Sequence, residues 1–217
     1  TGICGSGIIE VIAEMYLAGI ITTDGVVDGA LAERTQRITA DGRTFSFVLH
    51  RADDPEASDV LVTQNDVRQI QLAKAALYAG IKLLMDEMGV TTVDRIRLAG
   101  AFGSHISVSH AMVLGLIPDC DLEQVTSAGN AAGAGARMAL LDRAARVEIA
   151  ATIAKAERIE TAVADDFQAH FVGAMGLPHQ SDPFPHLFSV VAPPEAKVVE
   201  SPDAPKRRRR RNSRAGA

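Results

Sequence analysis

The stretch Arg97-Leu98-Ala99-Gly100-Ala101-Phe102-Gly103-Ser104-His105 constrains the fold more than any other part of the chain. A β-type run over residues 93–98 ends here in two glycines separated by small or flat residues, and a helical pattern over residues 108–114 follows. This order of strand, glycine turn and helix lets a backbone approach a phosphate or a nucleotide base closely. A second small-residue turn, residues 129–136, also leads into a helix. We therefore expect a fold that brings the two turns together.

Periodic patterns predict the remaining elements. Alternation around Asp41-Gly42 predicts a hairpin over residues 37–50, and residues 60–62 form a further short strand. A helix begins after a Ser6 N-cap, and a long helix runs from an Asn65-Asp66 cap to about residue 88. The apolar stripe of this long helix is the strongest periodic signal: Ile70, Ala73, Leu77, Ile81, Leu84 and Met88. Strands and helices alternate from residue 60 onward, which favours an α/β fold.

Composition divides the chain into a body, residues 1–178, and a tail, residues 179–217. The tail holds six of the nine prolines and a run of arginines, a composition that cannot bury a core, so we expect disorder. The body carries a net charge of −9 and the tail +4. An acidic body does not suit specific nucleic-acid binding. An arginine-rich tail is either solvated or a contact for an anionic partner.

The cellular setting follows from what the sequence lacks. No apolar run is long enough to span a bilayer, and no secretory signal is recognisable, so no membrane span is expected. Two cysteines without metal-ligand spacing, Cys4 and Cys120, suit a reducing cytoplasm. The chain opens on Thr1, without Met and within a glycine-rich turn, and we expect a fragment of a longer protein.

Several candidate sites keep two interpretations at this point. The Gly100–Gly103 turn matches neither the GxGxxG fingerprint nor the phosphate loop, so it is either a packing turn or a nucleotide contact. His105 and His110 are five residues apart, which favours loop or capping roles over a metal site. Cys4 is either a small buried residue or a thiolate favoured by a helix N-terminus. No nucleophile motif is recognisable, so no catalytic residue is assigned. No residue is assigned as a metal ligand.

Four segments occur in an order that resembles a known family: residues 2–9, 98–103, 115–118 and 129–136. Together they are similar to the C-terminal part of the reductive activators of corrinoid enzymes, over about residues 1–176. That resemblance implies an ASKHA-type ATPase module, the superfamily of actin, sugar kinases and chaperone ATPases. It further implies an incomplete ribonuclease H-like α/β subdomain. Members of the family carry a ferredoxin domain with an iron-sulfur cluster and use ATP to return cob(II)alamin to cob(I)alamin.

The resemblance also implies site residues. Residues 98–103 match the superfamily's adenosine motif, so Gly100, Ala101, Phe102 and Gly103 would lie against the nucleotide. Gly129, Asn130 and Gly133 match the second connecting segment at the hinge between subdomains, and Gly5 and Ser6 would flank the cleft. The phosphate-binding segment and the cluster cysteines are absent from this sequence and are expected before Thr1.

The resemblance leads to one expected function with two alternatives. We expect the adenosine-side half of an ATP- and magnesium-dependent reductive activase of one-carbon metabolism, inactive as an isolated fragment. Its expected partner is the corrinoid protein of a methyltransferase system, and a homodimer is left open. The alternatives are a small-molecule kinase or ATP-dependent hydrolase of the same superfamily, and a non-catalytic interaction domain.

Overall fold

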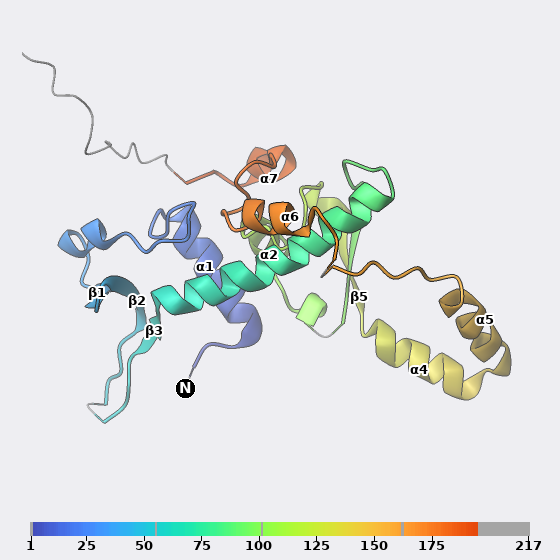
Figure 1. Ribbon diagram of the computed structural model, residues 1–217. Helices are drawn as coiled ribbons and strands as arrows, with labels where there is room; N and C mark the ends of the chain where they lie inside the picture. Colours follow the sequence, from blue (N-terminus) through green and yellow to red (C-terminus); the bar gives the residue numbers. More distant parts are fainter. Residues whose placement is uncertain (1, 55, 101, 162, 195–217) are drawn as a thin grey trace, which may run out of the picture.

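The computed structural model describes residues 2–54, 56–100, 102–161 and 163–194. Strands and helices alternate along most of the chain, as the sequence predicts (Figure 1). The strands are β1 (Ile38–Asp41), β2 (Thr44–His50), β3 (Val60–Val62), β4 (Ile96–Ala99) and β5 (Val125–Gly129). The α-helices are α1 (Gly5–Leu17), α2 (Gln64–Glu87), α3 (Val108–Val113), α4 (Ala131–Leu141), α5 (Arg143–Ile153), α6 (Phe167–Gly173) and α7 (Pro185–Val190). Short 3-10 helices cover Gly29–Glu33, Phe102–Ser104 and Leu122–Gln124.

The strands form two separate sheets. β1, β2 and β3 make an antiparallel sheet, whereas β4 and β5 pair in parallel. The predicted hairpin is confirmed: Asp41 pairs with Thr44 across the turn, and Gly42 has φ +59°. The β2–β3 ladder shifts register between Val48 and His50.

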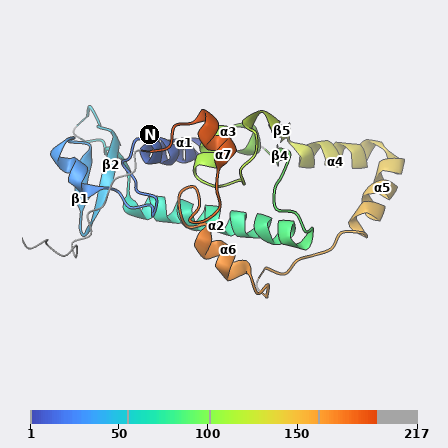
Figure 2. The same cartoon turned by 90° about the horizontal axis from the view of Figure 1, so that it is seen from above.

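Helix α2 crosses the molecule and packs against α6 (Figures 1 and 2). Its N-cap is Thr63, not the expected Asn65-Asp66 pair. The Thr63 hydroxyl accepts from the Asp66 backbone N–H at 3.1 Å, and the Asp66 carboxylate accepts from the Thr63 N–H at 2.8 Å. This capping box satisfies two backbone groups reciprocally, which an Asn65 cap would not do.

The buried face of α2 is not its apolar stripe. Leu77, Leu84 and Met88 are 49%, 55% and 74% exposed. The buried residues of the helix lie on another side and include polar ones: Val67, Gln71, Lys74, Ala75, Tyr78, Ala79, Leu83 and Met85. None of the described helices is long and apolar enough to cross a membrane.

The core lies between α1, α3 and α7. α1 packs against α3, and α3 contacts α7. The fully or nearly fully buried apolar side chains of this region are Ile9, Ile12, Met15, Met112, Val113, Leu114, Leu177 and Leu187. Gly115 follows α3 with φ +70°, the left-handed conformation in which glycine commonly ends a helix.

Packed structure continues past residue 178, so the predicted body–tail boundary lies too early. Phe184 and Leu187 join the core, at 3% and 0% exposure. Asp119 holds α7 in place because its carboxylate accepts from the backbone N–H groups of His186 and Leu187, both at 3.0 Å. Its carboxylate also lies 2.8 Å from the His186 Nδ1. The expected disorder of the arginine-rich end falls on residues 195–217, outside the described residues.

We expect Asp119→Ala to lower the free energy of unfolding by about 1–3 kcal/mol, because two amides at the start of α7 lose their acceptor. Urea unfolding measures this loss. The control is Asp121→Ala, whose carboxylate accepts from the Glu123 amide at the start of a three-residue 3-10 helix. An equal effect of both variants would contradict a specific role of Asp119.

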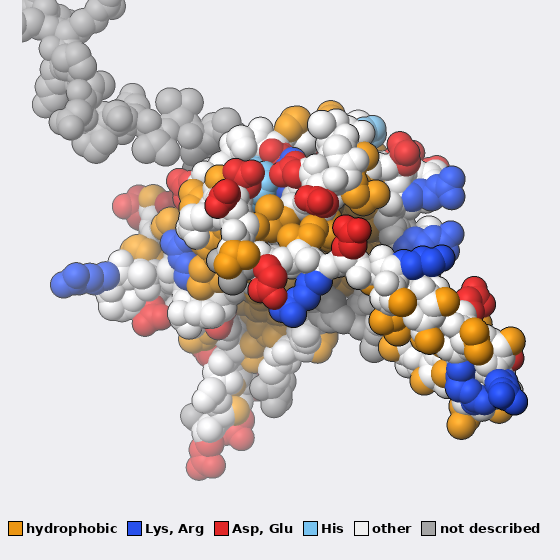
Figure 3. Space-filling view, turned by 45° about the vertical axis from the view of Figure 1, so that its right-hand side comes forward, with side chains coloured by type: hydrophobic (Ala, Val, Ile, Leu, Met, Phe, Trp, Pro, Cys, Tyr) orange, Lys and Arg blue, Asp and Glu red, His pale blue; other side chains and the backbone are white. Residues whose placement is uncertain are grey.

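Helices α4 and α5 project from the body as an arm (Figures 1 and 2). No residue of α4 is buried, and only Ala145 is buried in α5. Figure 3 shows apolar side chains interspersed with Lys and Arg on this arm. The most exposed large apolar residues here are Met138, Leu140, Leu141, Val147 and Ile153.

Candidate functional site

The parallel pair β4–β5 brings the two glycine turns together. Ile96 pairs with Val125 at the start of the strands, and Ala99 pairs with Gly129 at their end. Directly after this pair, the Gly100 N–H donates to the Gly129 carbonyl at 2.8 Å. Because parallel strands end at the same edge, both turns and the elements that follow them lie at that edge. The expected juxtaposition of the two turns is therefore present.

The glycines of these turns differ in the structural reason for which glycine is required. Gly100 has φ +103° and Gly129 has φ +62°, and a Cβ added to either would meet no atom of the other described residues within 4 Å, chain neighbours aside. Both positions thus require glycine for their backbone conformation and leave a bare surface in front of it. At Gly103 an added Cβ would lie 3.0 Å from the Leu98 Cβ, so Gly103 is a packing glycine. Ala101 lies outside the described residues, and Phe102 is described only as the start of a 3-10 helix.

Two serines that the sequence analysis did not single out link the turns. The Ser104 hydroxyl donates to the Gly100 carbonyl at 3.1 Å, and the Ser127 hydroxyl donates to that of Ser104 at 3.2 Å. The Gly129 N–H donates to the Ser127 hydroxyl at 3.1 Å. The network fixes one turn against the other. The position of both serines in small-residue turns at strand ends could have predicted this network from the sequence.

Asn130 and Gly133 form the start of α4. The Asn130 side chain is the N-cap and accepts from the Gly133 N–H at 2.9 Å. A Cβ at Gly133 would lie 2.7 Å from the Asn130 Nδ2, so glycine here makes room for the cap. The start of an α-helix concentrates amide donors and the positive end of the helix dipole. An anionic or hydrogen-bond-accepting group is favoured in front of it.

The turn with Gly5 and Ser6 begins α1, but its cap is Cys4 rather than the predicted Ser6. The Cys4 Sγ accepts from the Gly7 N–H at 3.3 Å and lies 3.6 Å from the Ser6 Oγ. The hydrogen bond with Ser6 and then that from Gly7 lower the pKa of the Cys4 thiol. Cys4 is exposed, not buried. α1 packs on α3, the helix after the first glycine turn, and this contact links the Gly5-Ser6 turn to the paired turns.

His110 joins helices. Its Nδ1 lies 2.7 Å from the Ser107 Oγ, and its Nε2 lies 2.7 Å from a Glu14 carboxylate oxygen on α1. Ser107 is the N-cap residue of α3, so the histidine fastens the start of α3 to α1. Among the described residues, no group of three or more His, Cys, Asp or Glu side chains has metal-site geometry.

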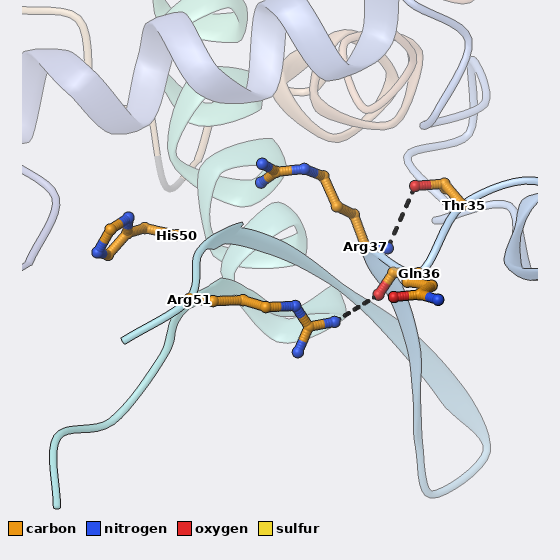
Figure 4. A pocket seen from close by; sticks show the side chains of 5 residues that line it. All are labelled: Thr35, Gln36, Arg37, His50 and Arg51. Carbon is orange, nitrogen blue, oxygen red and sulfur yellow. Dashed lines mark hydrogen bonds between the residues drawn. The ribbon is translucent and has the colours of Figure 1, made fainter. Parts of the chain in front are cut away.

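A pocket lies beside the hairpin, away from the glycine turns. Figure 4 shows this pocket of about 440 Å³, lined by Thr35, Gln36, Arg37, His50 and Arg51. The Arg37 guanidinium donates to the Val48 and Leu49 carbonyls, both at 2.9 Å, across the register shift. Arg51 donates to the Gln36 carbonyl at 2.7 Å. Both arginines therefore hold the hairpin in shape.

The fold and the site together define an α/β domain in which a parallel strand pair presents two glycine turns at one edge of the sheet. The family model described as "C-terminal domain of RACo the ASKHA domain" matches residues 1–188. The chain belongs to this family, and the predicted family and fold class are confirmed.

Two relatives support this assignment. The chain is 35% identical over 150 residues to the corrinoid activation enzyme RamQ of Eubacterium limosum, covering 65% of this chain and 25% of that protein. It is similar to the solved structure of a reductive activator for a corrinoid, iron-sulfur protein, with 33% identity and a TM-score of 0.74. That match covers 88% of this chain and 30% of the activator. The chain thus spans less than a third of each relative.

Proposed function

We propose that this domain supplies the adenosine side of the nucleotide site in an ATP-dependent activator, which returns the cob(II)alamin of a corrinoid protein to cob(I)alamin. The observation that carries the proposal is the hydrogen bond between Gly100 and Gly129, which aligns two bare glycine turns at one sheet edge. The relatives' names, a corrinoid activation enzyme and a reductive activator, support the direction of the chemistry.

The residues of the site fit a nucleotide better than a metal or a cluster. At Gly100 and Gly129 none of the described residues beyond the chain neighbours comes within 4 Å of the place of a side chain, so a flat base or ribose can approach the backbone. Bound ATP with magnesium would supply the free energy for an otherwise unfavourable reduction. This chain's part would be to bind and orient the adenosine, and to let differential affinity shift the two subdomain arrangements. Cys4 is exposed and Cys120 is buried, so these two do not suit an iron-sulfur cluster.

Gly100→Val is expected to weaken binding of a non-hydrolysable ATP analogue at least about tenfold, because the branched side chain would fill the space in front of the backbone. The full-length protein is titrated by calorimetry, and the melting temperature of each variant is recorded. The matched control is Gly89→Val: Gly89 has φ +64° and open space around it, but lies after α2. Both variants strain a left-handed backbone, so both lower the melting temperature.

The comparison of the two variants decides between a binding turn and a folding turn. If Gly89→Val weakened the analogue as much as Gly100→Val does, the effect would come from lost stability. If the full-length protein bound no ATP analogue at all, the glycine turns would only pack, as in the interaction-domain alternative.

Cob(I)alamin absorbance separates the activator from a kinase or hydrolase. With the full-length protein, a reductant and a matched corrinoid partner, we expect nucleotide-dependent recovery of the cob(I)alamin spectrum. No recovery would overturn the activator proposal. A cytoplasmic location and a homodimer are parts of the same proposal, and sedimentation of the full-length protein tests the dimer.

A further inference from the structure

An apolar cavity of about 800 Å³ lies between the end of α1 and the C-terminal segment. Its apolar walls include Ile21, Val26, Leu177, Phe184 and Phe188. Residues 97–104 and 127–133 do not line it, so it is separate from the glycine turns. Its volume is in the range of small-molecule sites, which are mostly apolar with a few polar groups.

The walls of the cavity are held by contacts that need no ligand. The Leu177 N–H donates to the Thr23 carbonyl at 2.9 Å, which fastens the C-terminal segment to the turn after α1. The Thr22 N–H donates to the Val26 carbonyl at 2.9 Å and closes that turn. On the other side, Asp119 fixes the start of α7 and with it Phe188. The cavity is therefore preformed.

Tyr16 places a hydroxyl group on the wall of the cavity. It lines the cavity and is 3% exposed. Among the described residues, no hydrogen bond of its hydroxyl is found, and the hydroxyl is not fully enclosed by protein, so a molecule in the cavity can reach it. Burial raises the pKa of Tyr16 to about 12, so the hydroxyl keeps its proton and is a donor at neutral pH.

Two other polar side chains at this cavity, Asp182 and His179, are already paired. The Asp182 carboxylate accepts from the Tyr78 hydroxyl at 2.8 Å and lies 3.3 Å from the Lys82 Nζ. The His179 Nδ1 accepts from the Asp182 N–H at 2.9 Å. Asp24 and Asp182 both line the cavity, so an anion is disfavoured there.

We propose that this cavity binds an uncharged, planar heteroaromatic molecule that accepts a hydrogen bond from the Tyr16 hydroxyl. The rings of Phe184 and Phe188 favour a planar aromatic occupant, because offset and edge-to-face ring contacts add to the apolar burial. The acceptor pairs with the Tyr16 hydroxyl, for which the described residues provide no hydrogen-bond partner. This proposal does not rest on nucleotide binding or corrinoid activation.

The test uses the full chain and two probes of the same shape, quinoline and naphthalene, of which only quinoline has a ring-nitrogen acceptor. Each probe is titrated by NMR against the wild type and Tyr16→Phe. We expect Tyr16→Phe to weaken quinoline binding by about three- to tenfold and to leave naphthalene binding unchanged. The melting temperature should stay the same or rise, since the hydroxyl has no partner to lose.

Two exposed valines locate the binding. Val26→Asp places a carboxylate on the cavity wall and should weaken both probes, whereas Val90→Asp, outside the cavity, should weaken neither. The proposal is overturned if quinoline does not bind in the millimolar range. It is also overturned if Tyr16→Phe affects both probes equally, or neither.

Discussion

Replacing Gly115 with alanine is expected to lower the free energy of unfolding by about 3–5 kcal/mol. Gly115 has φ +70°, where a Cβ is strained. The added Cβ would lie 2.1 Å from the Pro178 carbonyl oxygen, a distance that only a backbone shift can relieve. That oxygen accepts from the buried Lys74 Nζ at 2.7 Å, so moving it also weakens a hydrogen bond to a buried amine.

Gly89→Ala is the matched control for Gly115→Ala. Gly89 has a similar φ, +64°, but an added Cβ would meet nothing within 4 Å, so only the backbone strain of about 1 kcal/mol applies. Urea unfolding of the wild type and both variants measures the difference between the two losses in the free energy of unfolding. Equal losses would mean that residues 174–178 are not packed against the end of α3.

The elements that the sequence predicts well are those with local signals. Gly42 closes the predicted hairpin turn and has a positive φ, +59°. The predicted helix at the second small-residue turn is also present as α4, Ala131–Leu141, because Asn130 provides a local cap. These positions depend on the backbone conformation of a few neighbouring residues, which residue type largely determines.

Helix α2 shows what the hydrophobic period of a sequence does not predict. Periodicity identifies its apolar residues but not the face that meets the rest of the fold. The buried face includes Gln71 and Lys74, which are buried because they hydrogen-bond to distant backbone carbonyls. Gln71 donates to the Met175 carbonyl at 2.8 Å, and Lys74 to those of Gly176 and Pro178. Partners about a hundred residues away leave no trace in a helical period.

The candidate site was predictable in part. The two glycine turns are recognisable from spacing, and the alternation of strands and helices favours their meeting at one edge. The roles of single residues were not predictable: Gly103 packs on Leu98 and Gly133 accommodates Asn130, whereas Gly100 and Gly129 leave open space. Whether a glycine faces a neighbour or solvent depends on tertiary contacts. The predicted body–tail boundary at Pro178 lies too early for the same reason. Phe184 and Leu187 become core residues only through the tertiary contact between α7 and α3.

Lys74 should make the stability of the protein depend on pH in a direction unusual for a lysine. The side chain is fully buried, at 0% exposure, and its Nζ donates to two carbonyls rather than to a carboxylate. Burial lowers the pKa of Lys74 from 10.5 to about 7. In the unfolded chain the amine binds its proton up to about pH 10.5, whereas in the folded protein it releases it near pH 7. The unfolded state therefore binds more protons between these values, and stability rises with pH across this window.

We expect the lysine to contribute a slope of about 1.4 kcal/mol per pH unit between pH 7 and 10, and roughly 5 kcal/mol over the full difference. The measurement is urea unfolding of the wild type and Lys74→Met at several pH values. Methionine fills a similar volume without a titrating group, so the stability of the variant relative to the wild type should fall as pH rises. A constant offset, from the two carbonyls that lose their donor, does not affect this slope. The series stops at pH 10, because Tyr16, with its raised pKa, acts in the opposite direction above it. Parallel stability curves for the two proteins would show that the amine keeps its proton in the fold, and that the two carbonyls compensate for its burial.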